Sequence, residues 1–127
     1  MIIPYPSHLN PGEASLIRVN MEKPSLTYLK ELSNGNSTFE MKIFKILIEE
    51  LPEEYNAYQN AIRTKNFYWA ADIVHKIKQK VAFFQMHASV SISEEHESSL
   101  RSGKLKYQSD FQEIVTKILK FLPEHYD

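Results

Sequence analysis

The residue with the clearest chemical potential in this sequence is His75, which lies in the segment 70–81. Apolar residues there recur at the three- and four-residue spacing of an α-helix, and these are Val74, Ile77, Val81 and Phe84. His75 lies at the edge of this stripe, and Lys78, three residues on, shares its helix surface. An uncrowded imidazole close to a cation is a suitable site for a phosphoryl group. By residue type alone, however, a histidine on a helix near lysines is more often structural.

Other kinds of site have little support in the sequence. The absence of cysteine excludes disulfides, thiol catalysis and thiolate metal ligands. No Glu-x-x-His motif of a di-metal bundle site is found, nor a glycine-rich phosphate loop or a Gly-x-Ser-x-Gly turn. The remaining histidines are expected to have structural or solvent-exposed roles, and these are His8, His87, His96 and His125.

Length and charge narrow the class of protein further. A chain of 127 residues is expected to form one domain. The net charge of −1, without a basic block, gives no support for binding to nucleic acid or to a membrane surface. No apolar run approaches the roughly 20 residues that span a bilayer, and the N-terminus does not resemble a signal peptide. We therefore expect a cytoplasmic, monomeric protein.

The beginning of the chain differs in character from the rest. Residues 1–22 contain three prolines and no sustained apolar period, so we expect an extended N-terminal arm. Residues 23–127 are expected to form the domain. A short helix should open at Pro24 and end near Gly35, which is suited to a left-handed cap.

The next two expected helices have recognisable start signals. Ser37 and Glu40 fit a capping box at the start of the most strongly patterned helix in the chain. Pro52 falls inside that helix and predicts either a kink or two abutting helices. Asn66 is the expected N-cap of the following helix, which carries His75.

The last two expected helices differ in the strength of their patterns. Serines dilute the apolar period of residues 87–102, where the clear core candidates are Val90, Ile92 and Leu100. Ser109 or Asp110 should cap a final amphipathic helix that Pro123 ends. Four amphipathic helices joined by short loops pack most simply as an up-down bundle. We therefore expect an all-α fold, an up-down four-helix bundle with a short additional N-terminal helix.

The segment around His75 resembles a known signature. The run Val74-His75-Lys76-Ile77-Lys78 is similar to the Ala-His-Lys-x-Lys-Gly pattern of histidine phosphotransfer (HPt) domains of two-component phosphorelays. Downstream, His96-Glu97 followed by Arg101-Ser102-Gly103-Lys104 resembles the family's Leu-Glu and Arg-x-Gly segment. Upstream, residues 29–32, 39–62 and 65–67 resemble the family's first bundle helix and its turn into the histidine helix. The resemblance covers roughly residues 25–122.

This resemblance implies a phosphocarrier rather than a self-contained enzyme. Nε2 of His75 would take a phosphoryl group from an aspartate of a receiver domain and pass it to another receiver. Lys78 would be the charge partner of the phosphoryl oxygens, and Glu97 would accept the hydrogen of Nδ1. The implied partners are response-regulator receivers and a (hybrid) histidine kinase. The chain would need no cofactor of its own, because the receiver holds the Mg²⁺.

Two positions depart from the family pattern. Gln79 replaces the small residue, usually glycine, that follows the His-Lys-x-Lys run, and Gln85 replaces a glycine ten residues after the histidine. Gln79, one turn from His75, can either hydrogen-bond the phosphoryl group or crowd the receiver. We favour active transfer. The alternative is a helical adaptor that binds a receiver or a kinase without transferring phosphate.

The same helix surface would dock the receiver. Helical spacing from His75 places on this face the apolar Tyr68, Ala71, Ala82 and Met86, ringed by Asp72, Lys76 and Lys78.

Overall fold

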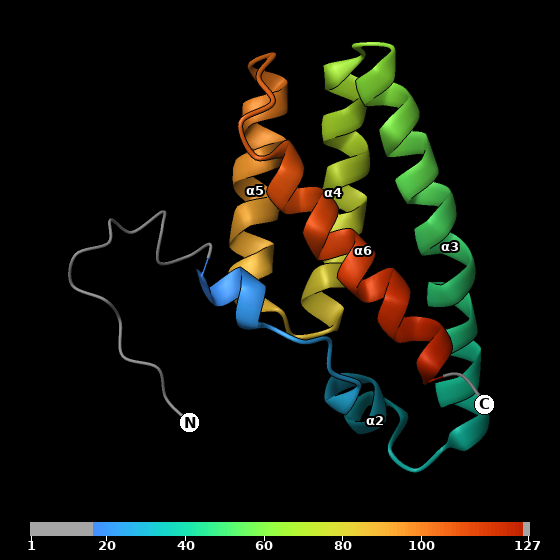
Figure 1. The fold of residues 1–127 in the computed structure, drawn as a ribbon. Helices are drawn as coiled ribbons and strands as arrows, with labels where there is room; N and C mark the ends of the chain where they lie inside the picture. The colour runs from blue at the N-terminus through green and yellow to red at the C-terminus, as the bar shows by residue number, and fades with distance from the viewer. Residues whose placement is uncertain (1–16, 126–127) are drawn as a thin grey trace.

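The fold is known from a computed structural model, which describes residues 17–125. All regular secondary structure in that range is α-helical. Besides a short helical segment at residues 17–21, it comprises α2 (Thr27–Ser33), α3 (Ser37–Arg63), α4 (Phe67–Phe83), α5 (His87–Arg101) and α6 (Gln108–Glu124). The long helices α3 to α6 pack against one another, with α2 at one end of α3 (Figure 1). The all-helical prediction is confirmed. The arrangement is compatible with an up-down four-helix bundle.

The core is formed by the apolar stripes of the long helices. α4 lies between α3 and α5, and its contact with α5 is the most extensive between any two of the described helices. Its buried residues include the predicted positions Val74, Ile77 and Val81. α6 covers α3 and α5 and buries Phe111, Ile114, Val115, Ile118 and Leu122. Because α4 has neighbours on two sides, its buried face is wider than one apolar stripe.

The start of α3 differs from the expectation. Asn36, not Ser37, is the N-cap, and its Oδ1 accepts a hydrogen bond from the backbone N–H of Phe39 at 3.0 Å. The predicted capping box is therefore wrong by one residue. α3 also continues through Pro52 as a single helix, so the alternative of two abutting helices is wrong. Pro52 is exposed, where water can satisfy the carbonyl that it leaves without a donor.

At the other helix ends, some of the predicted boundary residues are found in the structure and others are not. Asn66 is the N-cap of α4, as predicted, and its side chain accepts a hydrogen bond from Trp69 N–H at 3.2 Å. Gly35 has φ +84°, in the left-handed region as expected, but the C-cap of α2 is the preceding residue, Asn34, which is also left-handed with φ +47°. α6 begins at Gln108 with Tyr107 as its N-cap, so the prediction of Ser109 or Asp110 is wrong.

Residues 17–21, within the expected extended arm, are helical, so that prediction is wrong for them. Val19 is buried, and the ammonium group of Lys117 on α6 donates to the backbone carbonyls of Val19 and Glu22, each at 2.7 Å. The Glu22 carboxylate accepts hydrogen bonds from the backbone N–H groups of Ala88 and Ser89, each at 2.8 Å. It thereby caps α5, whose own N-cap residue forms no side-chain cap. Residues 1–16 of the expected arm lie outside the described residues.

α5 buries an unusually polar stripe. Its buried residues are Ser89, Ile92, Ser93, His96 and Leu100. Three of these five are polar, which explains why the apolar period of this segment is weak in the sequence. Val90, expected in the core, is partly buried.

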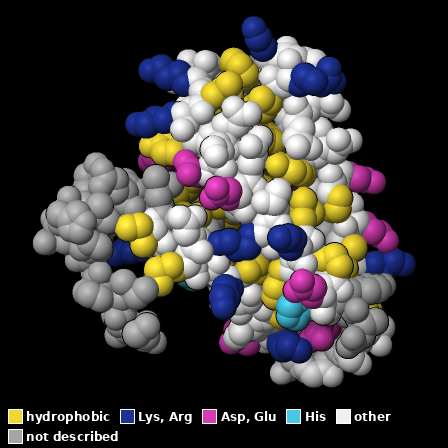
Figure 2. Space-filling model, viewed as in Figure 1, with side chains coloured by type: hydrophobic (Ala, Val, Ile, Leu, Met, Phe, Trp, Pro, Cys, Tyr) yellow, Lys and Arg dark blue, Asp and Glu magenta, His cyan; other side chains and the backbone are white. Residues whose placement is uncertain are grey.

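The surface carries charges of both signs. On the face viewed in Figure 2, basic and acidic side chains are interspersed with apolar ones rather than gathered by sign. Within residues 17–125, none of the helices combines the length and apolarity that crossing a membrane requires.

Candidate functional site

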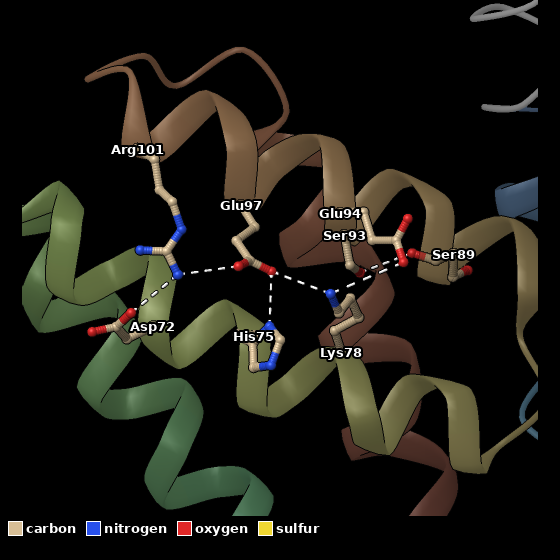
Figure 3. A network of polar contacts seen from close by, with 8 residues as sticks. All are labelled: Asp72, His75, Lys78, Ser89, Ser93, Glu94, Glu97 and Arg101. Carbon is tan, nitrogen blue, oxygen red and sulfur yellow. Dashed lines mark hydrogen bonds and ion pairs between the residues drawn. The ribbon is translucent and has the colours of Figure 1, made fainter.

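His75 lies on α4 with its ring open to solvent on one side. Its side chain is 51% exposed, and Nδ1 lies 3.2 Å from Oε1 of Glu97 on α5 (Figure 3). An ionised carboxylate only accepts hydrogen bonds, so a neutral His75 makes this contact with its proton on Nδ1. Nε2 points away from Glu97, and no residue within 17–125 hydrogen-bonds to it. The geometry therefore leaves the Nε2 lone pair free for an incoming electrophile.

Glu97 is the centre of a polar network between α4 and α5. Besides Nδ1 of His75, its Oε1 lies 3.3 Å from Nζ of Lys78, and its Oε2 lies 3.1 Å from Nη2 of Arg101. The same Nη2 lies 3.1 Å from Oδ1 of Asp72 (Figure 3). Burial on its own would raise the pKa of Glu97, but the hydrogen bonds from Arg101, His75 and Lys78 together lower that pKa below its usual value. Glu97 is therefore ionised at neutral pH.

The structure brings together the three residues that were expected to act in phosphotransfer. Lys78 and Glu97 meet directly, and both lie beside His75. The Lys78 side chain is only 18% exposed, and its Nζ also lies 4.0 Å from Oε1 of Glu94. Its ammonium group is thus held by two carboxylates.

The structure shows which residues of the predicted docking face are exposed. Tyr68 is 69% exposed, and Asp72, Lys76 and Ala82 are exposed as well, whereas Lys78 is only partly exposed. Ala71 and Met86 are 0% exposed, so their assignment to the face is wrong. Ala71 belongs to the wide buried side of α4. Met86 follows the end of α4 at Phe83, so helical spacing from His75 does not apply to it.

Three residues of the site were not predicted, namely Trp69, Ile73 and Arg101. A pocket beside His75 is lined by Trp69, Asp72, Ile73, Lys76, Glu97 and Arg101. The Trp69 side chain is 46% exposed, and Arg101 stacks over the Tyr68 ring with 5.2 Å between its Cζ and the ring centroid. The position of Arg101 four residues after Glu97 could have indicated an ion pair on one helix face. Nothing in the sequence pattern distinguished Trp69 from other exposed aromatic residues.

The two positions that depart from the resemblance have different surroundings. Gln79 is exposed on α4, one turn beyond His75. Gln85 lies in the turn after α4 with φ +61°, in the left-handed region that favours glycine. In this chain, a glutamine therefore adopts a backbone conformation that is typical of glycine.

No protein-family model, curated protein or solved structure gives a significant match to this chain. Among the residues that the structure describes, no three histidine, aspartate or glutamate side chains are grouped so that they could hold a metal ion.

Proposed function

We propose that this protein is a histidine phosphotransfer protein, in which α3 to α6 form an up-down four-helix bundle and His75 carries the phosphoryl group. The observation that supports this proposal best is the state of the His75 ring. Nδ1 is engaged by an ionised carboxylate at 3.2 Å, while Nε2 has no partner within residues 17–125 and half of the side chain is exposed. A buried ring, or one with both nitrogens engaged, could not accept a phosphoryl group in this way.

The transfer balances with the residues at hand. Nε2 attacks the phosphorus of an aspartyl-phosphate on a receiver, so that a P–N bond forms, the P–O bond breaks and the aspartate carboxylate leaves. The proton on Nδ1 stays in its hydrogen bond to Glu97, whose negative charge stabilises the positive charge that develops on the ring. Attack by the aspartate of a second receiver reverses these steps. Mg²⁺ would be held by the receivers.

Lys78 acts as the charge partner in this proposal. It exchanges its contacts with Glu94 and Glu97 for the phosphoryl oxygens once the group is on Nε2. The receiver would dock on the exposed residues around His75, which are Tyr68, Trp69, Asp72, Lys76, Gln79 and Ala82.

Transfer of radiolabelled phosphate tests the proposal. The protein is mixed with a panel of ³²P-phosphorylated receivers from the same genome, and we expect acid-labile, alkali-stable label on the wild type. His75→Ala should take no label. His87→Ala, which removes another exposed histidine, should be labelled as well as the wild type. Label that persists on His75→Ala would refute the assignment of the site.

The position of Gln79 favours a second candidate function. Its side chain is exposed one turn from His75, in the position where the resemblance implies a small residue. An adaptor that binds receivers without transfer would show measurable affinity for a receiver and no label. Gln79→Ala distinguishes the two functions, because label that appears only in this variant would mean that the wild-type side chain blocks transfer.

A further inference from the structure

A second histidine, next to Glu97 in the sequence, forms a polar pair inside the core. Nε2 of His96 on α5 lies 2.7 Å from the hydroxyl oxygen of Tyr58 on α3, and both side chains are 0% exposed. Phe111 of α6 packs against both rings, with centroid distances of 5.1 Å to His96 and 5.0 Å to Tyr58. Nδ1 of His96 has no hydrogen-bond partner in the part of the chain that the structure describes. Tyr58 is therefore the side chain to which the polar edge of His96 is tied.

His96 immediately precedes Glu97 in α5. Successive residues of an α-helix point about 100° apart. His96 accordingly reaches α3 in the core, while Glu97 reaches His75 on α4. Two adjacent residues thus connect one turn of α5 to two different helices, and a rotation of α5 about its axis cannot preserve both contacts.

The rest of the buried stripe of α5 is poorly suited to setting this rotation. Burial of apolar surface has little directionality, and Ser93 donates only to a carbonyl of its own helix. Ser89 does bond outside the helix, to the Glu22 carboxylate, but at the N-terminus of α5, about two turns away from Glu97. A hydrogen bond, in contrast, weakens steeply with distance and angle. The contact between Nδ1 of His75 and Glu97 measures 3.2 Å, at the long end of the range for such bonds, so a displacement of about 1 Å would break it.

We propose that Tyr58 and His96 are positioning residues that set the rotation of α5 and thereby hold Glu97 against Nδ1 of His75. Their bond would keep the His75 proton on Nδ1 and Nε2 unprotonated. An effect of this pair on phosphate transfer rests on the proposed function. An effect on which ring nitrogen of His75 carries the proton is independent of that function.

The test measures the tautomer of His75 by ¹⁵N NMR of the imidazole ring in the full chain at pH 8, where histidines are neutral. In the wild type we expect mainly the Nδ1–H form. Tyr58→Phe and, independently, His96→Phe should lower the ratio of the Nδ1–H to the Nε2–H form several-fold. Ile118→Val, a core change on α6 without a polar contact, should leave the ratio unchanged.

The double variant Tyr58→Phe/His96→Phe separates positioning from stability. Replacing both partners of a buried hydrogen bond by apolar groups of similar shape leaves a protein close to its original stability. We expect this variant to be folded yet to keep the lowered Nδ1–H ratio. A folded double variant with the wild-type ratio would overturn the proposal.

Phosphate transfer gives a separate readout. If the proposed function holds, transfer to His75 in the double variant should slow by roughly tenfold, since small misplacements of catalytic groups have effects of that order or larger. A wild type that never takes label, but whose His75 tautomer responds to the double substitution, would refute the proposed function and support the positioning pair.

Discussion

At the scale of single residues, Glu97 does more than orient a ring. Its carboxylate receives hydrogen bonds from His75, Lys78 and Arg101, and its side chain is only 15% exposed. A carboxylate in this position needs the two permanent cations, because an ionised group sheltered from water is costly without partners.

The first prediction concerns the charge of Glu97. Its pKa is lowered in the folded protein, so its contribution to stability is present above the pKa of the unfolded chain, near 4.5, and is lost as the pH falls through the lower folded value. Glu97→Gln should reduce the free energy of unfolding at pH 7 by about 1 kcal/mol, since it weakens charge-assisted hydrogen bonds. Urea unfolding measures this change. Part of the loss of wild-type stability below about pH 4.5 should disappear in the variant.

Glu95→Gln is the matched control, because Glu95 is exposed on the same helix. It should change the free energy of unfolding and its pH dependence very little. An equal effect of the two substitutions would mean that the hydrogen bonds to Glu97 add no stability.

At the scale of elements, the turn between α4 and α5 holds a residue in a costly conformation. Gln85 has φ +61°, and this conformation costs a non-glycine residue about 1 kcal/mol. The turn is tight because α5 begins at His87, only four residues after α4 ends at Phe83. The strained residue thus lies where the chain reverses direction between α4, which carries His75, and α5, which carries Glu97.

The second prediction compares one substitution at two positions. Gln85→Gly should raise the free energy of unfolding by about 0.5–1 kcal/mol, because glycine adopts this φ without a steric penalty. Gln79→Gly, inside α4, should lower it by about 1 kcal/mol, because glycine is unfavourable in a helix interior. Urea unfolding of both variants measures the two effects. Destabilisation by both would show that the conformation of Gln85 is not strained.

The third prediction concerns the N-terminus of α5. Glu22→Gln should lower the free energy of unfolding by about 1 kcal/mol, because an amide has one acceptor oxygen where the carboxylate has two and lacks the charge that favours a helix N-terminus. Hydrogen exchange at the Ala88 and Ser89 amides should become faster. Glu31→Gln on the exposed side of α2 is the control and should change neither quantity. Unchanged exchange in Glu22→Gln would contradict the cap.

At the scale of the whole molecule, the buried pair of His96 and Tyr58 ties stability to pH. Burial lowers the pKa of His96 to about 4, from an ordinary value of 6.5. Between these values the unfolded chain binds a proton at this position and the folded protein does not. The folded state therefore loses stability as the pH falls from 6.5 towards 4, and below that value this loss remains constant.

The fourth prediction concerns the stability that His96 costs the folded protein at low pH. The full loss from His96 is about 3 kcal/mol, since each unit of pKa difference corresponds to about 1.4 kcal/mol. Urea unfolding at several pH values between 7 and 4 should show a steep fall for the wild type and a flatter one for His96→Phe. His87→Ala, at an exposed position, should follow the wild type. A curve for His96→Phe that parallels the wild type would contradict the prediction.

The limits of the sequence are visible at particular residues. The period of α4 correctly placed Val74 and Ile77 in the core, and the short-range signal of Asn66 correctly placed the start of the helix. The period gave wrong positions for Ala71 and Met86. One is covered by a neighbouring helix, and the other lies beyond the point where the helix ends. Such errors are expected, because periodicity describes one helix and not what packs around it.

What the sequence determined by itself is local: the helices, most of their buried faces, and the closeness of Lys78 to His75 within one turn of α4. These depend on interactions between residues a few positions apart. Only the tertiary structure decided that Glu97, 22 residues away, engages Nδ1, and that Arg101 and Asp72 complete the network. It also decided that His96 is buried against Tyr58, 38 residues away. The physical reason is that the packing of α3, α4 and α5 sets the relative rotation of the helices, which no single helix encodes.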